Sequence, residues 1–208
     1  MALTAGSARE KAAGAVPRLL HVTDVFPPPV NAGSLEMRAA CERGIAVHAI
    51  CEAHDLGKEQ TVPPQYVGYW SAWIKFLADT GAEIIENELR IGGEKFGYVG
   101  RLDRVAKIKN KLWILDIKSG GPWPTHGPQT AAYEYAYRVE HFTKRSKEFR
   151  RACVHLKRDG RFAFAEHASV HDWHTFCAYQ RIAYFEIEHG LREWPALREG
   201  EDEYGKGM

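Results

Sequence analysis

The chain has 208 residues, of which 45% are hydrophobic and 12% aromatic, so it is long enough to bury a core within a single domain. Its formal net charge of +1 excludes a general electrostatic attraction to nucleic acid, so any such contact must rely on local charge. No stretch approaches the roughly 20 apolar residues of a membrane helix, and the charged N-terminal segment does not resemble a signal peptide. We therefore expect a cytoplasmic protein with no membrane partner.

The N-terminal third predicts an arm followed by two helices. Residues 1–33 are expected to form a partly irregular arm, because they contain three consecutive prolines. Ser34 is a suitable N-cap for a helix that extends to about Ala53. A second amphipathic helix is expected after the next pair of prolines and ends at Gly81.

From residue 83 onward the hydrophobic period changes from helical to alternating, which predicts strands at residues 84–91, 98–108 and 111–118. The last two are joined by a tight turn. The later elements are a helix from Pro128, a type I′ hairpin turn at Asp159-Gly160, and a helix from the capping box Ser169/Asp172 to Gly190.

This order of elements predicts an α/β fold with a central mixed β-sheet flanked by helices. We expect a single domain over residues 34–192, followed by an acidic, flexible tail over residues 193–208. Basic residues are frequent between Arg138 and Arg161, which is typical of a solvated face or of a local DNA-binding patch.

The candidate chemistry lies in the strands. Asp116 and Lys118 share one face of the strand 111–118, because side chains alternate along a strand. Counting the pairing across the turn places Asp103 of the neighbouring strand close to Asp116. Two carboxylates and a lysine suit Mg²⁺ or Mn²⁺ and phosphodiester hydrolysis. The alternative is a buried salt bridge beside an exposed Asp103.

Four motifs accompany these residues, in the order RGIAVH (43–48), GRLD (100–103), DIKSG (116–120) and QTAAY (129–133). Together they resemble the PD-(D/E)XK nuclease superfamily, and specifically its RecB-like exonuclease branch. The matched motifs span less than half of the chain, and Leu102 replaces the nominal proline before the first acid. The resemblance implies a restriction-endonuclease-like core.

The resemblance also implies roles for individual residues. Asp103, Asp116, His48 and the backbone carbonyl of Ile117 match the metal ligands, and Lys118 matches the catalytic lysine. The ligands would hold Mg²⁺ or Mn²⁺.

Further positions match more loosely. Glu88 resembles an additional metal-binding acid, although Glu86 lies on the same face of its strand and is an equal alternative. Gln129 and Tyr133, one helical turn apart, match a pair that lies near the active site and the DNA backbone. Arg101 and Arg104 flank the first acid and are candidate phosphate contacts, or ordinary strand charges.

Cysteine and histidine spacing gives no further site. The four cysteines are too few and too widely spaced for the iron–sulfur cluster of some relatives, so we expect none. Several later histidines show no zinc-binding pattern, namely His126, His155, His167, His171 and His174.

The expected function is a metal-dependent DNA nuclease, and more specifically an exonuclease of DNA recombination, repair or phage DNA processing. Its partners would be DNA ends or single strands and a helicase or recombination protein, in a bacterial cell or a phage-infected host. A structure-specific or nicking endonuclease and a catalytically silent DNA-binding module are the alternatives. The silent module is disfavoured, because neither acid nor the lysine is missing.

Overall fold

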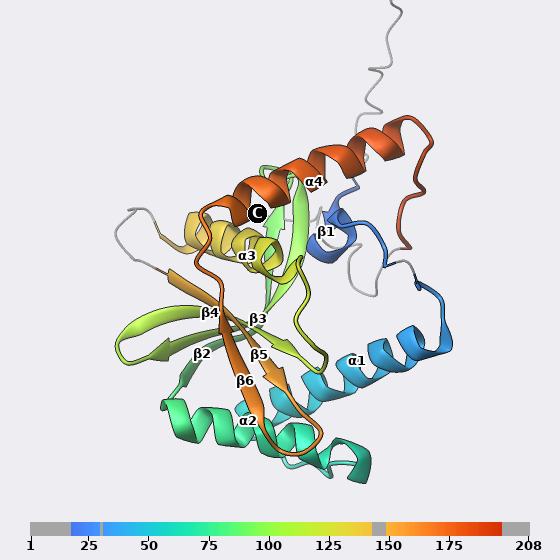
Figure 1. Ribbon diagram of the computed structural model, residues 1–208. Helices are drawn as coiled ribbons and strands as arrows, with labels where there is room; N and C mark the ends of the chain where they lie inside the picture. Colours follow the sequence, from blue (N-terminus) through green and yellow to red (C-terminus); the bar gives the residue numbers. More distant parts are fainter. Residues whose placement is uncertain (1–17, 30, 143–148, 197–208) are drawn as a thin grey trace, which may run out of the picture.

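A mixed β-sheet forms the centre of the protein in a computed structural model that describes residues 18–29, 31–142 and 149–196 (Figure 1). Its strands are β1 (Leu20–His21), β2 (Glu83–Gly93), β3 (Tyr98–Ile108), β4 (Lys111–Lys118), β5 (Phe149–Leu156) and β6 (Phe162–Glu166). β2 pairs with β3 along one edge, whereas β1 and β4 share the other edge of β3. β4 and β5 are parallel, and β6 pairs antiparallel with β5.

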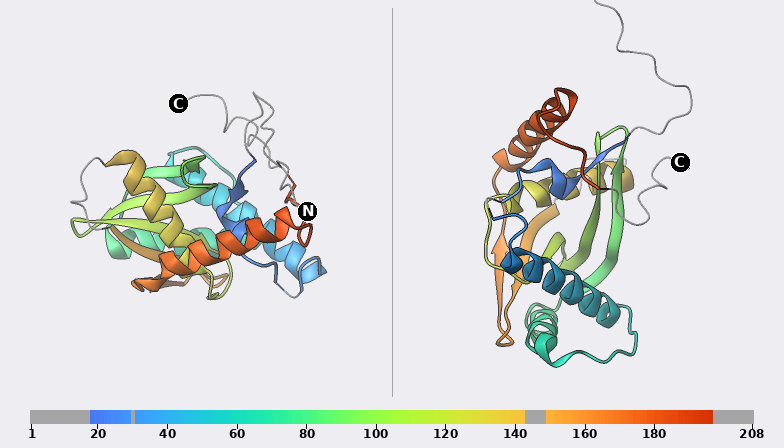
Figure 2. Two further views of the ribbon diagram at one scale, coloured as in Figure 1. Left: turned by 90° about the horizontal axis from the view of Figure 1, so that it is seen from above. Right: turned by 90° about the vertical axis from the view of Figure 1, so that its right-hand side faces the viewer.

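Helices cover both faces of the sheet, as the two further views show (Figure 2). They are α1 (Leu35–Asp55), α2 (Val67–Thr80), α3 (His126–His141) and α4 (His171–Glu188), with short 3₁₀ helices η1 (Val22–Val25) and η2 (Pro64–Tyr66). One apolar cluster joins α1 and α2 to β3–β6, and a second joins α3, α4 and η1 to the other face. The predicted α/β class with a central mixed sheet is confirmed. No helix in the described ranges is long and apolar enough to cross a bilayer.

Several predicted element ends are also confirmed. The Ser34 hydroxyl accepts a hydrogen bond of 3.1 Å from the backbone N–H of Met37 and so caps α1. Gly81 ends α2 in the left-handed conformation, with φ of 62°. On β4, Trp113 and Leu115 pack in the α1/α2 cluster while Ile114 packs in the opposite one, so the side chains alternate as predicted.

The predicted start of α3 is wrong by two residues. The helix begins at His126, and Pro128 is the third residue of its first turn. Backbone N–H groups of a first turn have no partner within the helix, so proline is tolerated there as well as at the first position.

The predicted type I′ turn is also wrong. In the β5–β6 loop only Gly160 has a positive φ, of 81°, and its N–H donates to the carbonyl of Lys157. This pattern is a three-residue loop ending in a left-handed glycine. The two consecutive left-handed residues that a type I′ turn requires are Lys109 and Asn110, between β3 and β4, with φ of 47° and 63°.

The capping box predicted for α4 does not form. The Ser169 hydroxyl accepts from the N–H of His171, but the Asp172 carboxylate contacts Arg151 at 3.1 Å. Arg151 is buried, and it attracts Asp172 because an unpaired buried guanidinium is costly.

Part of the predicted N-terminal arm belongs to the core. β1 pairs in parallel with the start of β3, and Leu20, Val22 and Val25 are each at most 1% exposed. The proline run begins only after this segment, so it does not prevent the pairing. Of the predicted acidic tail, residues 197–208 lie outside the described residues.

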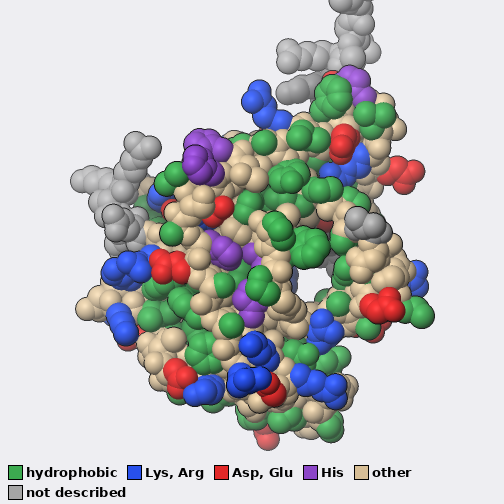
Figure 3. Space-filling model, in the orientation of Figure 1, with side chains coloured by type: hydrophobic (Ala, Val, Ile, Leu, Met, Phe, Trp, Pro, Cys, Tyr) green, Lys and Arg blue, Asp and Glu red, His purple; other side chains and the backbone are tan. Residues whose placement is uncertain are grey.

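The basic region between Arg138 and Arg161 does not form one uniform surface. Arg151 is buried, Arg150 pairs with Glu166 at 3.2 Å, and Lys157 and Arg158 are exposed at the β5–β6 turn. Figure 3 shows Lys and Arg side chains at this lower end of the molecule. Three basic residues of the region, Lys144, Arg145 and Lys147, lie outside the described part of the chain.

Candidate active site

A cleft of about 680 Å³ opens where α1, β2, β3, β4 and α3 meet. Its walls carry almost every residue that the sequence motifs indicate, namely His48, Glu88, Arg101, Asp103, Asp116, Lys118, Gln129 and Tyr133. These residues come from five separate segments of the chain, which therefore converge on one cleft.

The two acids lie side by side on neighbouring strands. The antiparallel pairing of β3 and β4 ends with Arg104 opposite Leu115, and Asp103 and Asp116 are the next residues beyond this pair. Both side chains are buried, at 5% and 1% exposure. One oxygen of Asp103 accepts a hydrogen bond of 2.6 Å from the backbone N–H of Ile117, which holds the carboxylate against β4.

A cluster of metal-ligating side chains forms where α1 crosses these strands. Nδ1 of His48 lies 3.6 Å from Asp103 Oδ1 and 3.7 Å from Glu88 Oε1. Ligand atoms of these three residues all lie within 4.8 Å of one another. Nε2 of His48 donates to the carbonyl oxygen of Ile117 at 2.8 Å, so a fourth predicted ligand is adjacent.

The structure separates Glu88 from its alternative. The backbone of Glu88 is left-handed, with φ of 48°, which is uncommon for this residue type and occurs often at functional sites. Its carboxylate joins His48 and Asp103, whereas Glu86 does not line the cleft. Glu88 is therefore the acid of β2 that belongs to the candidate site.

Asp116 makes a second set of contacts in the same cleft. Its carboxylate receives Lys118 Nζ at 2.6 Å and the Gln129 amide at 3.1 Å. Gln129 also accepts from Lys118 at 3.2 Å and donates to the Tyr133 hydroxyl at 3.1 Å. Asp116 is not part of the three-residue ligand cluster, because its oxygens face this lysine and amide.

The residues of this cleft could form a nuclease active site or a coincidental group of acids, and the comparison with protein families distinguishes these two interpretations. The model of the PD-(D/E)XK nuclease superfamily matches residues 30–199. The chain belongs to this superfamily. No curated protein matches the sequence. Membership implies metal-dependent nuclease activity, and the central mixed sheet flanked by helices agrees with the restriction-endonuclease-like fold of PD-(D/E)XK proteins.

The electrostatics of this PD-(D/E)XK cleft fit a divalent cation. Burial, together with the charges of Asp116 and Glu88, raises the pKa of Asp103 to about 7. Burial lowers the pKa of His48, but the charges of Asp103 and Glu88 outweigh this effect and raise it to about 9. The two carboxylates therefore keep the imidazole of His48 protonated. A metal cation bound by His48 and the carbonyl oxygen of Ile117 would replace a proton of that ring.

Lys118 remains an ammonium beside this cluster. Burial opposes its charge, but Asp116 and Asp103 outweigh that effect and raise the pKa of Lys118. A charged lysine can stabilise negative charge on a phosphoryl group and orient a water molecule. Its contacts with Asp116 and Gln129 fix the position of the ammonium group in the cleft.

The sequence left two interpretations open for Arg104, a phosphate contact and an ordinary strand charge, and the structure buries this side chain away from solvent. Its side chain is 0% exposed and pairs with Asp55 at 2.6 Å and with Glu88 at 2.9 Å. Asp55, at the end of α1, also accepts from the Trp73 indole at 2.8 Å. The sequence motifs gave no signal for Asp55, because its role depends on where α1 ends in space. Arg101, by contrast, is exposed at the cleft.

The glycine of the GRLD motif has a steric role. A Cβ atom at Gly100 would lie 2.9 Å from Cε1 of Tyr133 and 3.0 Å from Cγ2 of Val22. Tyr133 is 2% exposed and its hydroxyl contacts Gln129, so the glycine lets the last residue of the QTAAY motif pack directly on β3. The GRLD motif on β3 and the QTAAY motif on α3 therefore pack directly against each other.

We expect Gly100→Ala to destabilise the protein by about 1–3 kcal/mol, because the added methyl group overpacks this contact. Gly121→Ala is the matched control, since a Cβ there meets no atom within 4 Å. Urea unfolding of both variants measures the difference. Equal stability of the two would contradict the proposed packing role.

A second prediction concerns pH in the metal-free protein. The folded pKa of His48 is about 9, above its ordinary value of 6.5, so its contribution to stability is complete below pH 6.5 and is lost as the pH rises through 9. Asp103, with its raised pKa of about 7, acts in the same direction but mainly below pH 7. The free energy of unfolding should therefore fall between pH 7 and pH 9, as measured by urea titration with a chelator present.

His48→Gln provides the comparison for this pH dependence. Burial raises the pKa of the Cys51 and Cys153 thiols, which adds a decline of the same sign in both proteins. In His48→Gln, the free energy of unfolding should decline with pH only by the part that the two thiols cause. Parallel curves for the two proteins would show that His48 is not the group responsible.

Proposed function

We propose that this chain is a Mg²⁺- or Mn²⁺-dependent DNA exonuclease. The proposal rests chiefly on the cluster of His48, Glu88 and Asp103, whose ligand atoms lie within 4.8 Å of one another. Carboxylate oxygens, a carbonyl and one imidazole suit these cations. Asp116, which contacts Lys118 at 2.6 Å, would complete the proposed ligand set.

The roles of the residues follow from their positions. The bound ion would polarise the phosphodiester and lower the pKa of a water molecule. Lys118 would stabilise the developing negative charge on the phosphoryl group. Gln129 would keep the side chains of Lys118 and Asp116 in place through its hydrogen bonds to both. Arg101 would contact the DNA backbone at the mouth of the cleft, because its side chain is exposed there.

Exonuclease activity is favoured by the resemblance to the RecB-like branch, in which a histidine helix and a QxxxY helix flank the metal site. α1 and α3 bring His48 and Gln129 to the cleft in the same manner. A role in recombination, repair or phage DNA processing, alongside a helicase or recombination protein, belongs to the same proposal. An endonuclease on this fold remains the second candidate.

A digestion panel tests the proposal. Linear duplex, covalently closed circular and single-stranded DNA are incubated with Mg²⁺ or Mn²⁺, and Asp116→Ala and Lys118→Ala serve as inactive variants. We expect degradation of DNA that has ends and none of closed circles. Cleavage of closed circles would overturn the exonuclease assignment, and activity that survives in Asp116→Ala would overturn the site itself.

A further inference from the structure

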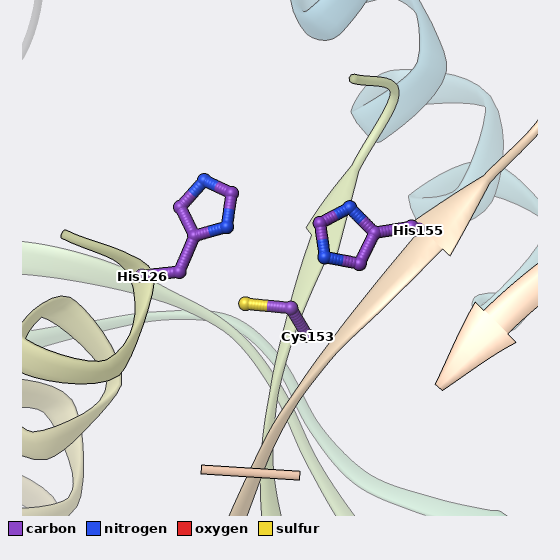
Figure 4. Close-up of side chains that lie close together, drawn as sticks. All are labelled: His126, Cys153 and His155. Carbon is purple, nitrogen blue, oxygen red and sulfur yellow. The ribbon is translucent and has the colours of Figure 1, made fainter. Parts of the chain in front are cut away.

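Three further metal-ligating side chains gather on the other side of Asp116. His126 is the first residue of α3, and Cys153 and His155 lie two residues apart on β5, where they share one face of the strand. One ligand atom from each residue lies within 4.8 Å of the others. Figure 4 shows the two rings and the thiol facing one another.

The His155 ring is already oriented for a metal ion. It is 4% exposed, and its Nδ1 lies 2.8 Å from the carbonyl oxygen of Gly120. A carbonyl can only accept, so Nδ1 carries the proton and Nε2 carries the lone pair. This buried Nε2 has no hydrogen-bond partner among the described residues. Metal-bound histidines typically show such an arrangement, in which the second ring nitrogen donates to a carbonyl.

The other two side chains have suitable chemistry. Burial and the charge of Lys118 lower the pKa of His126 to about 4, so its ring is neutral and can act as a ligand. Its Nδ1 accepts a long hydrogen bond of 3.3 Å from the Trp123 N–H, which coordination through that atom would replace. Burial raises the pKa of the Cys153 thiol, and its sulfur lies 3.5 Å from Asp116. A divalent cation would displace the thiol proton to solvent, since a coordinating thiol binds as thiolate.

We propose that His126, Cys153 and His155 form a zinc site. Two imidazoles and one thiolate are ligands that Zn²⁺ prefers, unlike the oxygen-rich set of the nuclease cleft. Zinc ligands lie about 2.0–2.3 Å from the ion, so the donors need only small side-chain rotations to surround one ion.

This site goes beyond the proposed nuclease function. It joins the first residue of α3 to β5, and three residues later α3 carries Gln129, which contacts Asp116. The zinc ion would therefore fasten the start of α3 next to the cleft. Its three ligands are distinct from His48, Glu88 and Asp103, although Cys153 contacts Asp116 between the two clusters.

Cobalt substitution of the 208-residue chain tests the site. Metal-free protein is titrated with Co²⁺, and we expect one equivalent to produce thiolate-to-cobalt charge-transfer absorption and strong visible bands that Zn²⁺ then removes. Cys153→Ser should lose the charge-transfer band. Cys51→Ser is the matched control, because Cys51 is equally buried, at 0% exposure, and should retain the band. Asp103→Asn should also retain it, even where nuclease activity is lost.

His155→Gln supplies an independent variant in case Cys153→Ser does not fold, as judged by circular dichroism. It should weaken Co²⁺ binding at least about tenfold and change the visible bands. The absence of charge-transfer absorption in the wild-type protein overturns the proposal without any variant. A band that persists in Cys153→Ser, or unchanged binding and spectra in His155→Gln, would also overturn it.

Discussion

Asp103→Asn is expected to reduce DNA cleavage by about 10³-fold or more, because metal-assisted charge stabilisation is worth several kcal/mol and each tenfold in rate corresponds to about 1.4 kcal/mol. The metal-free protein should be as stable as the wild type, or more stable. Burial raises the pKa of Asp103 to about 7, so above that pH the folded state carries a negative charge that is less favourable there than in the unfolded chain. Asparagine removes the charge and keeps an oxygen for the Ile117 N–H.

Initial cleavage rates on labelled DNA and thermal unfolding with a chelator at about pH 8 measure the two effects. Asp79→Asn is the matched control, because it makes the same change at an exposed acid of α2 that pairs with Lys75. It should alter neither rate nor stability. Full activity of Asp103→Asn would contradict the proposed metal site, whereas a large loss of stability would indicate that Asp103 acts structurally.

Arg104→Met is expected to lower the free energy of unfolding by about 3–5 kcal/mol, the usual effect of removing one partner from a buried ion pair. The substitution leaves Asp55 and Glu88 without the guanidinium that contacts them at 2.6 and 2.9 Å. Glu88 would also lose the contact that fixes its carboxylate near His48. Urea unfolding measures the loss of stability.

Arg101→Met is the control for this prediction, because Arg101 lies three residues earlier on β3 but is exposed. We expect no change in the free energy of unfolding and a weaker affinity for DNA. The affinity should also depend less steeply on salt concentration, by about the amount that one phosphate contact contributes. A stable Arg104→Met protein that binds DNA less tightly would reverse the roles that we assign to the two arginines.

The sequence by itself determined the main elements of the fold and the strand pair that carries the candidate site. Alternation along residues 111–118 placed Asp116 and Lys118 on one face, and the tight turn after residue 108 placed Asp103 beside them. These are local relationships, since the period of a strand and the length of a turn set them. The histidine helix and the QxxxY helix came from the ordered motifs, and the family match supports the superfamily assignment.

Only the tertiary structure decided which charged groups meet. Glu86 and Glu88 were equivalent in the sequence, but the left-handed backbone at Glu88 directs that acid into the cleft. In the sequence, Arg104 resembled a surface cation, but in the structure Asp55 at the end of α1 lies against it. Contacts of this kind join residues that are far apart in the chain, so no local period or spacing encodes them.

The cluster of His126, Cys153 and His155 is the clearest case of a contact that no local sequence pattern encodes. His126 and Cys153 are separated by most of α3 and by the start of β5, and neither belongs to a spacing typical of zinc sites. They meet because β4 and β5 pair in parallel, which requires the crossover through α3. The sequence determined the strand periods and the motif order, whereas the packing of the crossover helix decided which side chains share a site.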